Sequence, residues 1–339
     1  MQNPAILFTS PGIAELVEKP MEEISGTKVL VKLAVSTISS GTERANITGD
    51  PNNNYHEHST VAVFPRKGGY SSAGTVVAVG EAVTSVKPGD RVALSWSCHQ
   101  LYNLMEERDV TPLADGISME AAALFHIGTF PMGALRKCRL EIGESAIVMG
   151  QGVLGILAVQ LLRAAGAVPV IAADPDPDKR EKALRLGADA ALDPNAPDFA
   201  QAVQALTGGG ARVGIEVTGF GRALDQILDG MAHYGRVALL GCTRSSDFTI
   251  DYYRKVHGPG ITLIGAHTTA RPEVESYPGW WTTRDDVAAI MRLHAAKRLD
   301  FAALVEETHS PLEAPEVYAR LAAGGPFPIV QFDWRKLEE

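Results

Sequence analysis

Cysteine is scarce in this chain, with three among its 339 residues: Cys98, Cys138 and Cys242. No two of them form a C-x-x-C pair. The sequence therefore carries neither a disulfide framework nor a four-cysteine zinc lobe. This cysteine usage is typical of a protein that stays in a reducing compartment.

Excess positive charge and long apolar runs are lacking as well. The formal net charge is −9, and no basic stripe is present to neutralise phosphates, so a nucleic-acid partner is not expected. The longest apolar stretch, residues 146–173, is interrupted by glycines and by Arg163, which argues against a membrane span. The first residues lack the charged-then-apolar shape of a signal peptide. We therefore expect a cytoplasmic protein that acts on a small molecule.

Two parts of the chain differ in their predicted secondary structure. Residues 28–95 are rich in short strand patterns separated by turns, whereas helical and strand patterns alternate from about residue 119 onward. This alternation predicts a parallel sheet covered by helices on both faces. Helices are predicted at 119–137, 153–165, 178–186, 198–206, 221–232 and 284–297, and strands at 146–149, 168–172, 190–192, 213–217, 236–240 and 261–264. A last strand near 329–332 could return to the first region.

A glycine-rich turn joins the first of these strands to the following helix. Residues 150–155 read Gly-Gln-Gly-Val-Leu-Gly, and Asp174 closes the next apolar stretch. In this pattern the first glycine allows a tight turn, the second lets backbone approach a pyrophosphate, and the third lets helix pack on strand. The helix N-terminus offers free N–H groups and its positive dipole end to the phosphates. The sequence therefore predicts a dinucleotide-binding βαβ unit.

The chain resembles the medium-chain dehydrogenase/reductase superfamily over nearly its full length. The matching segments are 83–92 (VTSVKPGDRV), 150–155 (GQGVLG), 186–189 (LGAD), 216–219 (EVTG) and 235–241 (GRVALLG). The resemblance implies an α/β fold in which a Rossmann doubly wound parallel sheet, residues 121–266, is inserted in a GroES-like β-rich catalytic domain, residues 1–120 and 267–339. It also implies an active site between these domains and a homodimer or homotetramer formed through the Rossmann edge strands.

Zinc-binding members of this superfamily differ from the chain at their metal ligands. Ser40-Gly41-Thr42-Glu43 stands where they have a Cys-Gly-Thr-Asp-like segment, and Gly69-Tyr70-Ser71 stands where they have Gly-His-Glu. His126 falls at about the place of a third ligand. Zinc needs three or four nitrogen, sulfur or oxygen ligands in tetrahedral geometry. One histidine beside Ser40 and Tyr70 cannot supply them, so we predict an enzyme that works without zinc.

Without a metal, side chains must take the hydroxyl proton of an alcohol. His126 is the first candidate, since histidine titrates near neutral pH, although it could equally be a buried structural histidine. Glu43, at the place of the acid that orients a zinc ligand, could orient His126, act as the base itself, or form a surface salt bridge with Arg44.

Two hydroxyl residues complete the predicted catalytic set with Ser40. By the resemblance, Thr42 corresponds to a residue that relays the alcohol proton, although the histidine that completes some relays is replaced by Ala45. Tyr70 either donates to the substrate oxygen or simply packs. His99 and His257 have no motif support and are predicted to be surface residues.

The choice of cofactor depends on Asp174. A carboxylate there accepts hydrogen bonds from ribose hydroxyls and repels a 2′-phosphate, which favours NAD over NADP. The alternative is a helix N-cap, a role that Asp178 can fill. The predicted cofactor contacts are Gly150, Gly152, Val153, Leu154, Gly155 and Asp174, with Val217, Thr218, Gly241, Cys242, Thr243, Ala266 and His267 added by the resemblance.

Two segments bear on the substrate. Residues 50–58 contain His56 and His58 in a polar loop, and residues 276–281 contain Trp280 and Trp281. Amide, imidazole and aromatic groups together suit a polyhydroxylated ring, with hydroxyls bonded at the rim and C–H faces stacked on indoles. Alternatively, the histidines are solvated and the tryptophans cover a domain interface or an oligomer contact.

The sequence thus favours an NAD-dependent, zinc-independent dehydrogenase that oxidises a secondary alcohol of a sugar, glycoside or cyclitol, or reduces the ketone. One alternative is a zinc-free quinone or enoyl reductase, although Asp174 disfavours the NADPH expected of it. A second alternative is a non-catalytic NAD-binding sensor on the same fold.

Overall fold

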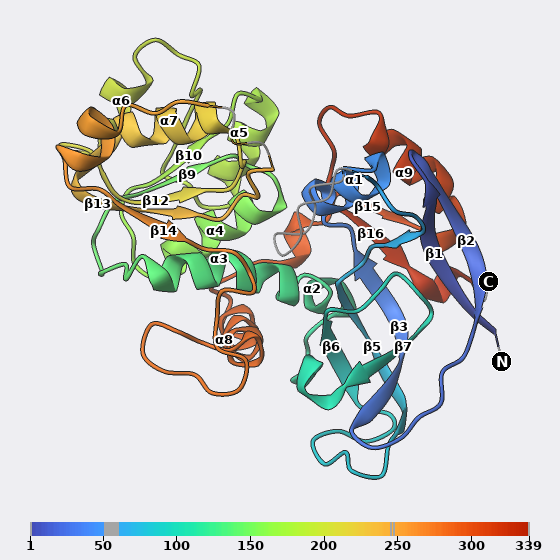
Figure 1. Ribbon diagram of the computed structural model, residues 1–339. Helices are drawn as coiled ribbons and strands as arrows, with labels where there is room; N and C mark the ends of the chain where they lie inside the picture. The colour runs from blue at the N-terminus through green and yellow to red at the C-terminus, as the bar shows by residue number, and fades with distance from the viewer. Residues whose placement is uncertain (1, 51–60, 245, 247, 338–339) are drawn as a thin grey trace. The chain divides into compact units, whose positions relative to one another are not determined.

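The computed structural model (Figure 1) describes residues 2–50, 61–244, 246 and 248–337. The chain forms two compact units. The first comprises Met1–Ile127, Val287–Ala295 and Phe301–Glu339, and the second Gly128–Asp286 and Ala296–Asp300. Residues 267–286 and 296–300 thus group with the second unit, and residues 121–127 with the first, which differs from the predicted division at residues 120 and 266. Arg271 explains the grouping of residues 267–286, because its guanidinium bonds to the carbonyl of Thr129 and to Asp286 within the second unit.

The second unit has a six-stranded parallel sheet. Its order is β11 (Ala190–Leu192), β10 (Val170–Ala173), β9 (Ala146–Met149), β12 (Ala211–Glu216), β13 (Met231–Leu239) and β14 (Thr262–Gly265). In chain order this is 3-2-1-4-5-6, the order of a Rossmann fold. All six predicted strands are present, with ends shifted by a few residues. The prediction of a doubly wound parallel sheet is confirmed.

Helices cover both faces of this sheet. In Figure 1, α6 (Phe199–Thr207) and α7 (Gly221–Asp229) lie on one face, and α3 (Phe125–Lys137) and α4 (Val153–Ala164) lie on the other. α5 (Pro177–Arg185) connects β10 to β11. The predicted helix at 119–137 is interrupted, with α2 (Met119–Ala122) ending two residues before α3 begins. The sheet is buried on both sides, so β9 and β10 are apolar throughout instead of alternating.

The first unit is β-rich. Its larger sheet runs β15 (Glu307–His309), β16 (Val330–Asp333), β3 (Lys28–Thr37), β5 (Ser71–Val79), β6 (Arg91–Ser95) and β8 (Val110–Pro112), and β7 (Tyr102–Glu106) also pairs with β3. β16 is the predicted returning strand, and it pairs antiparallel with β3. A smaller sheet joins β1 (Gln2–Ser10), β2 (Ile13–Pro20) and β4 (Arg66–Lys67).

Two helices of the first unit position its polar side chains. α1 (Ser40–Thr48) follows β3 directly, and α9 (Ala314–Ala322) packs on α1 and on β2. The sequence patterns had not indicated α1. α8 (Thr283–Ala295) matches the helix predicted at 284–297. Among the described residues, no helix combines the length and the hydropathy that a bilayer crossing requires.

The close packing of α4 on the glycine-rich turn gives a stability prediction. A Cβ at Gly155 would lie 1.8 Å from the carbonyl oxygen of Gly150, so Gly155→Ala must push the helix from the strand. We expect the free energy of unfolding to fall by about 2 kcal/mol or more, measured by urea denaturation. The control is Gly265→Ala, where a Cβ meets nothing within 4 Å. Equal midpoints for wild type and Gly155→Ala would contradict the packing described.

Candidate active site

The glycine-rich turn has the geometry that its sequence predicts. Gly150 has φ +96° and leads into the turn, and Gly152 is the N-cap of α4. A Cβ at Gly152 would meet nothing within 4 Å, whereas the neighbouring Gly155 is in tight contact. The space above Gly152 is therefore open to a ligand, and the first N–H groups of α4 face it. These residues fit a dinucleotide pyrophosphate.

Asp174 lies at the carboxyl end of β10, with only 5% of its surface exposed. One carboxylate oxygen accepts from the backbone N–H of Gln151 at 2.7 Å, and the other from the backbone N–H of Asp176 at 2.9 Å. Each oxygen keeps a second lone pair for a ribose hydroxyl. Asp174 is not the cap of α5, because Asp176 accepts from the N–H groups at the start of that helix. Asp178, the predicted alternative cap, lies in the first turn.

Glu216 organises the next strand end. Its buried carboxylate accepts from the backbone N–H groups of Thr218 and Gly219 and from the Thr218 hydroxyl. Burial raises the pKa of this carboxyl above its usual range. A Cβ at Gly241 would lie 2.3 Å from the backbone nitrogen of Gly219, so β12 and β13 end in close contact. Val217, Thr218, Gly241 and Cys242, four of the predicted cofactor contacts, thus lie close together after the ends of β12 and β13.

In the first unit, a ring cluster gathers around His126. The His126 imidazole lies 5.8 Å from the ring of Tyr70 and 4.6 Å from that of Trp96, edge-to-face in both cases. The Tyr70 hydroxyl donates a short hydrogen bond to the hydroxyl of Ser39, the N-cap of α1. His126 is 1% exposed and Trp96 is 42% exposed, so Trp96 is the outer member of the cluster.

The structure thus brings together two of the predicted catalytic residues, Tyr70 and His126. Ser40 and Thr42 occupy the first turn of α1, directly after Ser39. Trp96 was missed by sequence reasoning, because no motif marks it. It follows β6 with φ +64°, a conformation that is unusual for a large side chain.

Glu43 does not lie on the surface. It is fully buried, and its carboxylate accepts four hydrogen bonds, from the backbone N–H groups of Ser39 and Gly69, from Nε2 of His99, and from the hydroxyl of Tyr318. A carboxylate has about four acceptor positions, so these bonds use its capacity. The salt bridge with Arg44 is ruled out, because the Arg44 guanidinium instead donates to backbone carbonyls near the end of α9.

His99 corrects another prediction. It was expected on the surface, but it is 1% exposed and lies 3.1 Å from Glu43. Its Nδ1 lies 2.7 Å from the hydroxyl of Ser36, which accepts from the indole N–H of Trp334. Since an ionised carboxylate only accepts, Nε2 of His99 carries a proton. His257 is exposed, as predicted.

Two glycines make room for this network. A Cβ at Gly68 would lie 2.8 Å from Oε2 of Glu43, and a Cβ at Gly69, where φ is +90°, would lie 2.4 Å from His99. The carbonyls of Gly68 and Tyr70 accept hydrogen bonds from the backbone N–H groups of His99 and Trp96, in the segment between β6 and β7. Through its hydrogen bond to the N–H group of Gly69, Glu43 therefore fixes the backbone directly before Tyr70.

The donor set at the three ligand positions of zinc relatives consists of a serine, a tyrosine that acts as a hydrogen-bond donor, and a histidine. Within residues 2–50, 61–244, 246 and 248–337, no three His, Cys, Asp or Glu side chains gather as a metal site. Structural and catalytic zinc sites draw their ligands from those four residue types. The residues of this cluster do not fit a zinc ion.

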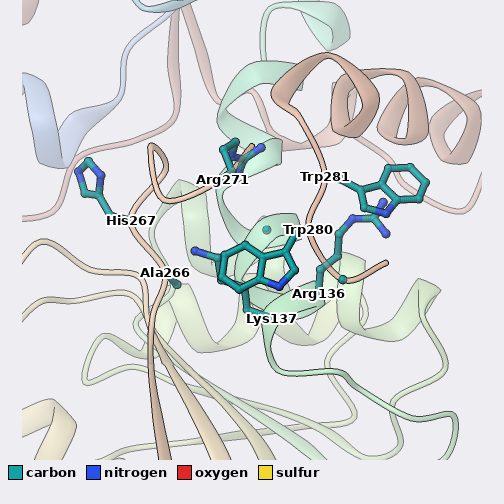
Figure 2. Close-up of a pocket in the computed structure, with 9 residues that line it drawn as sticks. Arg136, Lys137, Ala266, His267, Arg271, Trp280 and Trp281 are labelled. Atoms are coloured by element: carbon teal, nitrogen blue, oxygen red, sulfur yellow. The ribbon is translucent and has the colours of Figure 1, made fainter. Parts of the chain in front are cut away.

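Trp280 and Trp281 line a hollow in the second unit (Figure 2). The Arg136 guanidinium lies 3.7 Å from the centre of the Trp281 ring, and the Lys137 ammonium lies 5.2 Å from that of Trp280. Ala266 and His267, two predicted cofactor contacts, line the same hollow. The predicted substrate residues His56 and His58 lie outside the described residues.

Comparison with known proteins matches both units. The model of the alcohol dehydrogenase GroES-like domain matches residues 26–137, and that of zinc-binding dehydrogenases matches residues 153–280. The D-guloside 3-dehydrogenase of Escherichia coli (strain K12) is 25% identical over 293 residues, which is 81% of this chain and 83% of the relative. The L-threonine 3-dehydrogenase of Pyrococcus horikoshii is 28% identical over 292 residues, 77% and 82% of the two chains.

A solved structure gives the same fold. Galactitol-1-phosphate dehydrogenase from Escherichia coli superposes with a TM-score of 0.83 at 20% identity, over 98% of this chain and 100% of the other. A GroES-like domain together with a Rossmann-type sheet defines the alcohol dehydrogenase-like class of proteins. The chain belongs to the medium-chain dehydrogenase/reductase superfamily, as its sequence had indicated.

The Glu43 network gives a pH-dependent stability prediction. Complete burial and the neighbouring carboxylate of Glu43 raise the pKa of Tyr318 well above its ordinary value of 10. Tyr318→Phe removes a donor from a buried charge, so we expect the free energy of unfolding near neutral pH to fall by about 1–3 kcal/mol. Tyr253→Phe, at a tyrosine that is 70% exposed, is the control and should change little.

The sign of the pH effect follows from the raised pKa. Above about pH 10 the unfolded tyrosine ionises while the folded one stays protonated, so wild type loses up to about 1.4 kcal/mol per pH unit from this residue. The difference between wild type and Tyr318→Phe should therefore narrow above pH 10 in urea titrations. A difference that stays constant to about pH 11 would show that Tyr318 ionises normally in the folded protein.

Proposed function

We propose that the protein is an NAD-dependent, zinc-independent dehydrogenase that interconverts a secondary alcohol and a ketone on a sugar, glycoside or cyclitol. The observation that carries the proposal is the contact between Tyr70 and His126, which stand at two of the ligand positions of zinc relatives. Tyr70 also bonds to Ser39, the residue before the predicted Ser40. These side chains suit proton transfer and hydrogen bonding better than metal binding. Relatives named as guloside and threonine dehydrogenases support the alcohol chemistry.

The cofactor part of the proposal rests on the second unit. Gly152 and the start of α4 would hold the pyrophosphate, and Asp174 would bond to the ribose hydroxyls. The carboxylate of Asp174 would repel a 2′-phosphate, which favours NAD. The nearby Arg180 guanidinium is engaged with the carbonyls of Asp174 and Pro175. Bound NAD would supply the hydride acceptor for the carbinol carbon.

The proton is assigned to His126. Because Glu43 already accepts four hydrogen bonds, it is a poor base, and its role is to position Ser39 and the backbone before Tyr70. The imidazole of His126 takes the hydroxyl proton as the alcohol is oxidised and returns it in the reverse direction. Tyr70 and Ser39, joined by their own hydrogen bond, orient the substrate oxygen beside it.

The substrate class follows from what surrounds His126. Trp96 is the exposed ring of the cluster, so an incoming substrate meets an indole first and the hydroxyls of Tyr70 and Ser39 next. An aromatic face with adjacent hydroxyl partners suits a ring that has both C–H faces and polar edges. The named specificity of the guloside dehydrogenase relative agrees with this class.

The cofactor assignment predicts a specific loss. Asp174→Ala removes the acceptor for the ribose hydroxyls and should weaken NAD binding about tenfold or more, measured by isothermal titration. It should also reduce discrimination against NADP, since the repelling charge is gone. Asp178→Ala, at an exposed carboxylate on the next helix, is the matched control. Unchanged NAD affinity in Asp174→Ala would refute the assignment.

The catalytic assignment predicts a difference between two histidines. With NAD and a panel of sugars, glycosides and cyclitols, wild type should form NADH on at least one substrate. His126→Ala should lower kcat by about 100-fold or more while NAD affinity stays the same. His257→Ala, at an exposed histidine, should leave kcat unchanged. Normal turnover in His126→Ala would remove His126 as the base, and activity confined to quinones with NADPH would overturn the proposed function.

A further inference from the structure

A small hollow that is open to solvent lies in the second unit. Its wall is formed by the last turns of α3, by the chain after β14, and by the loop before α8. In Figure 2, Trp280 lies in the middle of the view, between His267 on one side and Trp281 with Arg136 on the other. Gly133, Arg136, Lys137, Ala266, His267, Arg271, Gly279, Trp280 and Trp281 line it.

The hollow has an excess of positive charge, although the chain as a whole has a net charge of −9. Arg136, Lys137 and Arg271 are all part of its lining. One carboxylate, Asp286, faces two of them, at 2.8 Å from Nε of Arg136 and 3.1 Å from Nη1 of Arg271. Two of the three cations thus share one buried counter-charge, and Lys137 is not one of them.

Lys137 is the cation with bonding capacity left. Its ammonium donates to the carbonyl of Gly265 at 3.1 Å, and an ammonium has three donors. In the part of the chain that the structure describes, no carboxylate pairs with it. Arg271, by contrast, already donates to the carbonyls of Thr268 and Thr129 in addition to Asp286.

The pKa of Lys137 is consistent with this excess of positive charge. Partial burial, together with the positive charge of Arg271, lowers the pKa of Lys137 below its usual value. A cation destabilised in this way gains free energy when an anion enters beside it. Because the groups are already in place, the anion would not have to assemble its own site.

The two indoles hold the cations in position. Trp281 stacks on Arg136, and the faces of Trp280 are flanked by Lys137 and by Tyr277, whose ring lies 6.4 Å away. Cation–π contacts of this kind restrict flexible side chains and exclude water from one side of them. The indole of Trp280 therefore forms an apolar wall beside the ammonium.

We propose that this hollow binds the anionic oxygen group, a phosphate ester or a carboxylate, of a small carbohydrate-like ligand, with Lys137 as its principal contact and Trp280 as the adjoining wall. The hollow includes Ala266 and His267, two predicted cofactor contacts, but its proposed ligand contacts, Lys137 and Trp280, lie outside the glycine-rich turn. Binding there requires no turnover, so it can be measured without cofactor and independently of the proposed function.

The test is isothermal titration of cofactor-free protein with inorganic phosphate, glucose 6-phosphate, gluconate and, as the neutral counterpart, glucose. At least one anion should bind, glucose should not, and binding should weaken as salt is raised. Lys137→Met and Lys137→Gln should each weaken the anion about 10- to 100-fold, the value of a hydrogen bond to a charged group. Lys19→Met, on β2 in the first unit, removes an equal charge elsewhere and should bind like wild type.

A further variant separates this hollow from the helix N-terminus of α4. Gly152→Ala places a methyl group in the open space above the glycine-rich turn and should leave the binding of the anion unchanged. The proposal is overturned if no anion binds, if glucose binds as well as glucose 6-phosphate, or if Gly152→Ala abolishes binding while both folded Lys137 variants retain it. NADH formation in the same preparations reports on the proposed function separately, since it depends on His126 and not on Lys137.

Discussion

The buried carboxylate of Glu43 is the interaction on which the first unit depends. Burying a carboxylate away from water costs free energy unless hydrogen-bond donors replace the lost water. Two backbone N–H groups, an imidazole and a phenol are the donors to Glu43. These donors come from the start of α1, from Gly69, from the segment between β6 and β7, and from α9. Four separate parts of the chain are therefore held at one point, and Tyr70 follows directly after one of them, Gly69.

This use of Glu43 bears on the chemistry. By the resemblance, zinc relatives use an acid at this place to orient a metal ligand. In this chain all acceptor positions of the acid, Glu43, are used by hydrogen bonds that hold the backbone and buried side chains in place. In the proposed function each group has one task. Glu43 supports the backbone, Tyr70 and Ser39 orient the substrate oxygen, and His126 moves the proton.

The sequence predicted those parts of the fold that depend on patterns over a few neighbouring residues. The strands of the Rossmann sheet, the turn at Gly150, and the close contact at Gly155 follow from apolar runs and glycine spacing, which act over a few residues. The partners of Glu43 lie 4, 26, 56 and 275 residues away along the chain, and no periodicity indicates such contacts. His99 was thus misplaced on the surface, and Trp96 and Tyr318 were missed. Residues 276–281 were recognised from the sequence as bearing on the substrate, but the cations that face the two indoles come from α3.

The proposed function requires that side chains, with no metal ion, handle the proton during hydride transfer. The most direct measurement is turnover of protein stripped of metal by a chelator, with NAD and an accepted polyol, alongside elemental analysis of the same sample. We expect full kcat with well under one zinc per chain. Loss of activity on stripping, restored by added zinc in a one-to-one ratio, would contradict it.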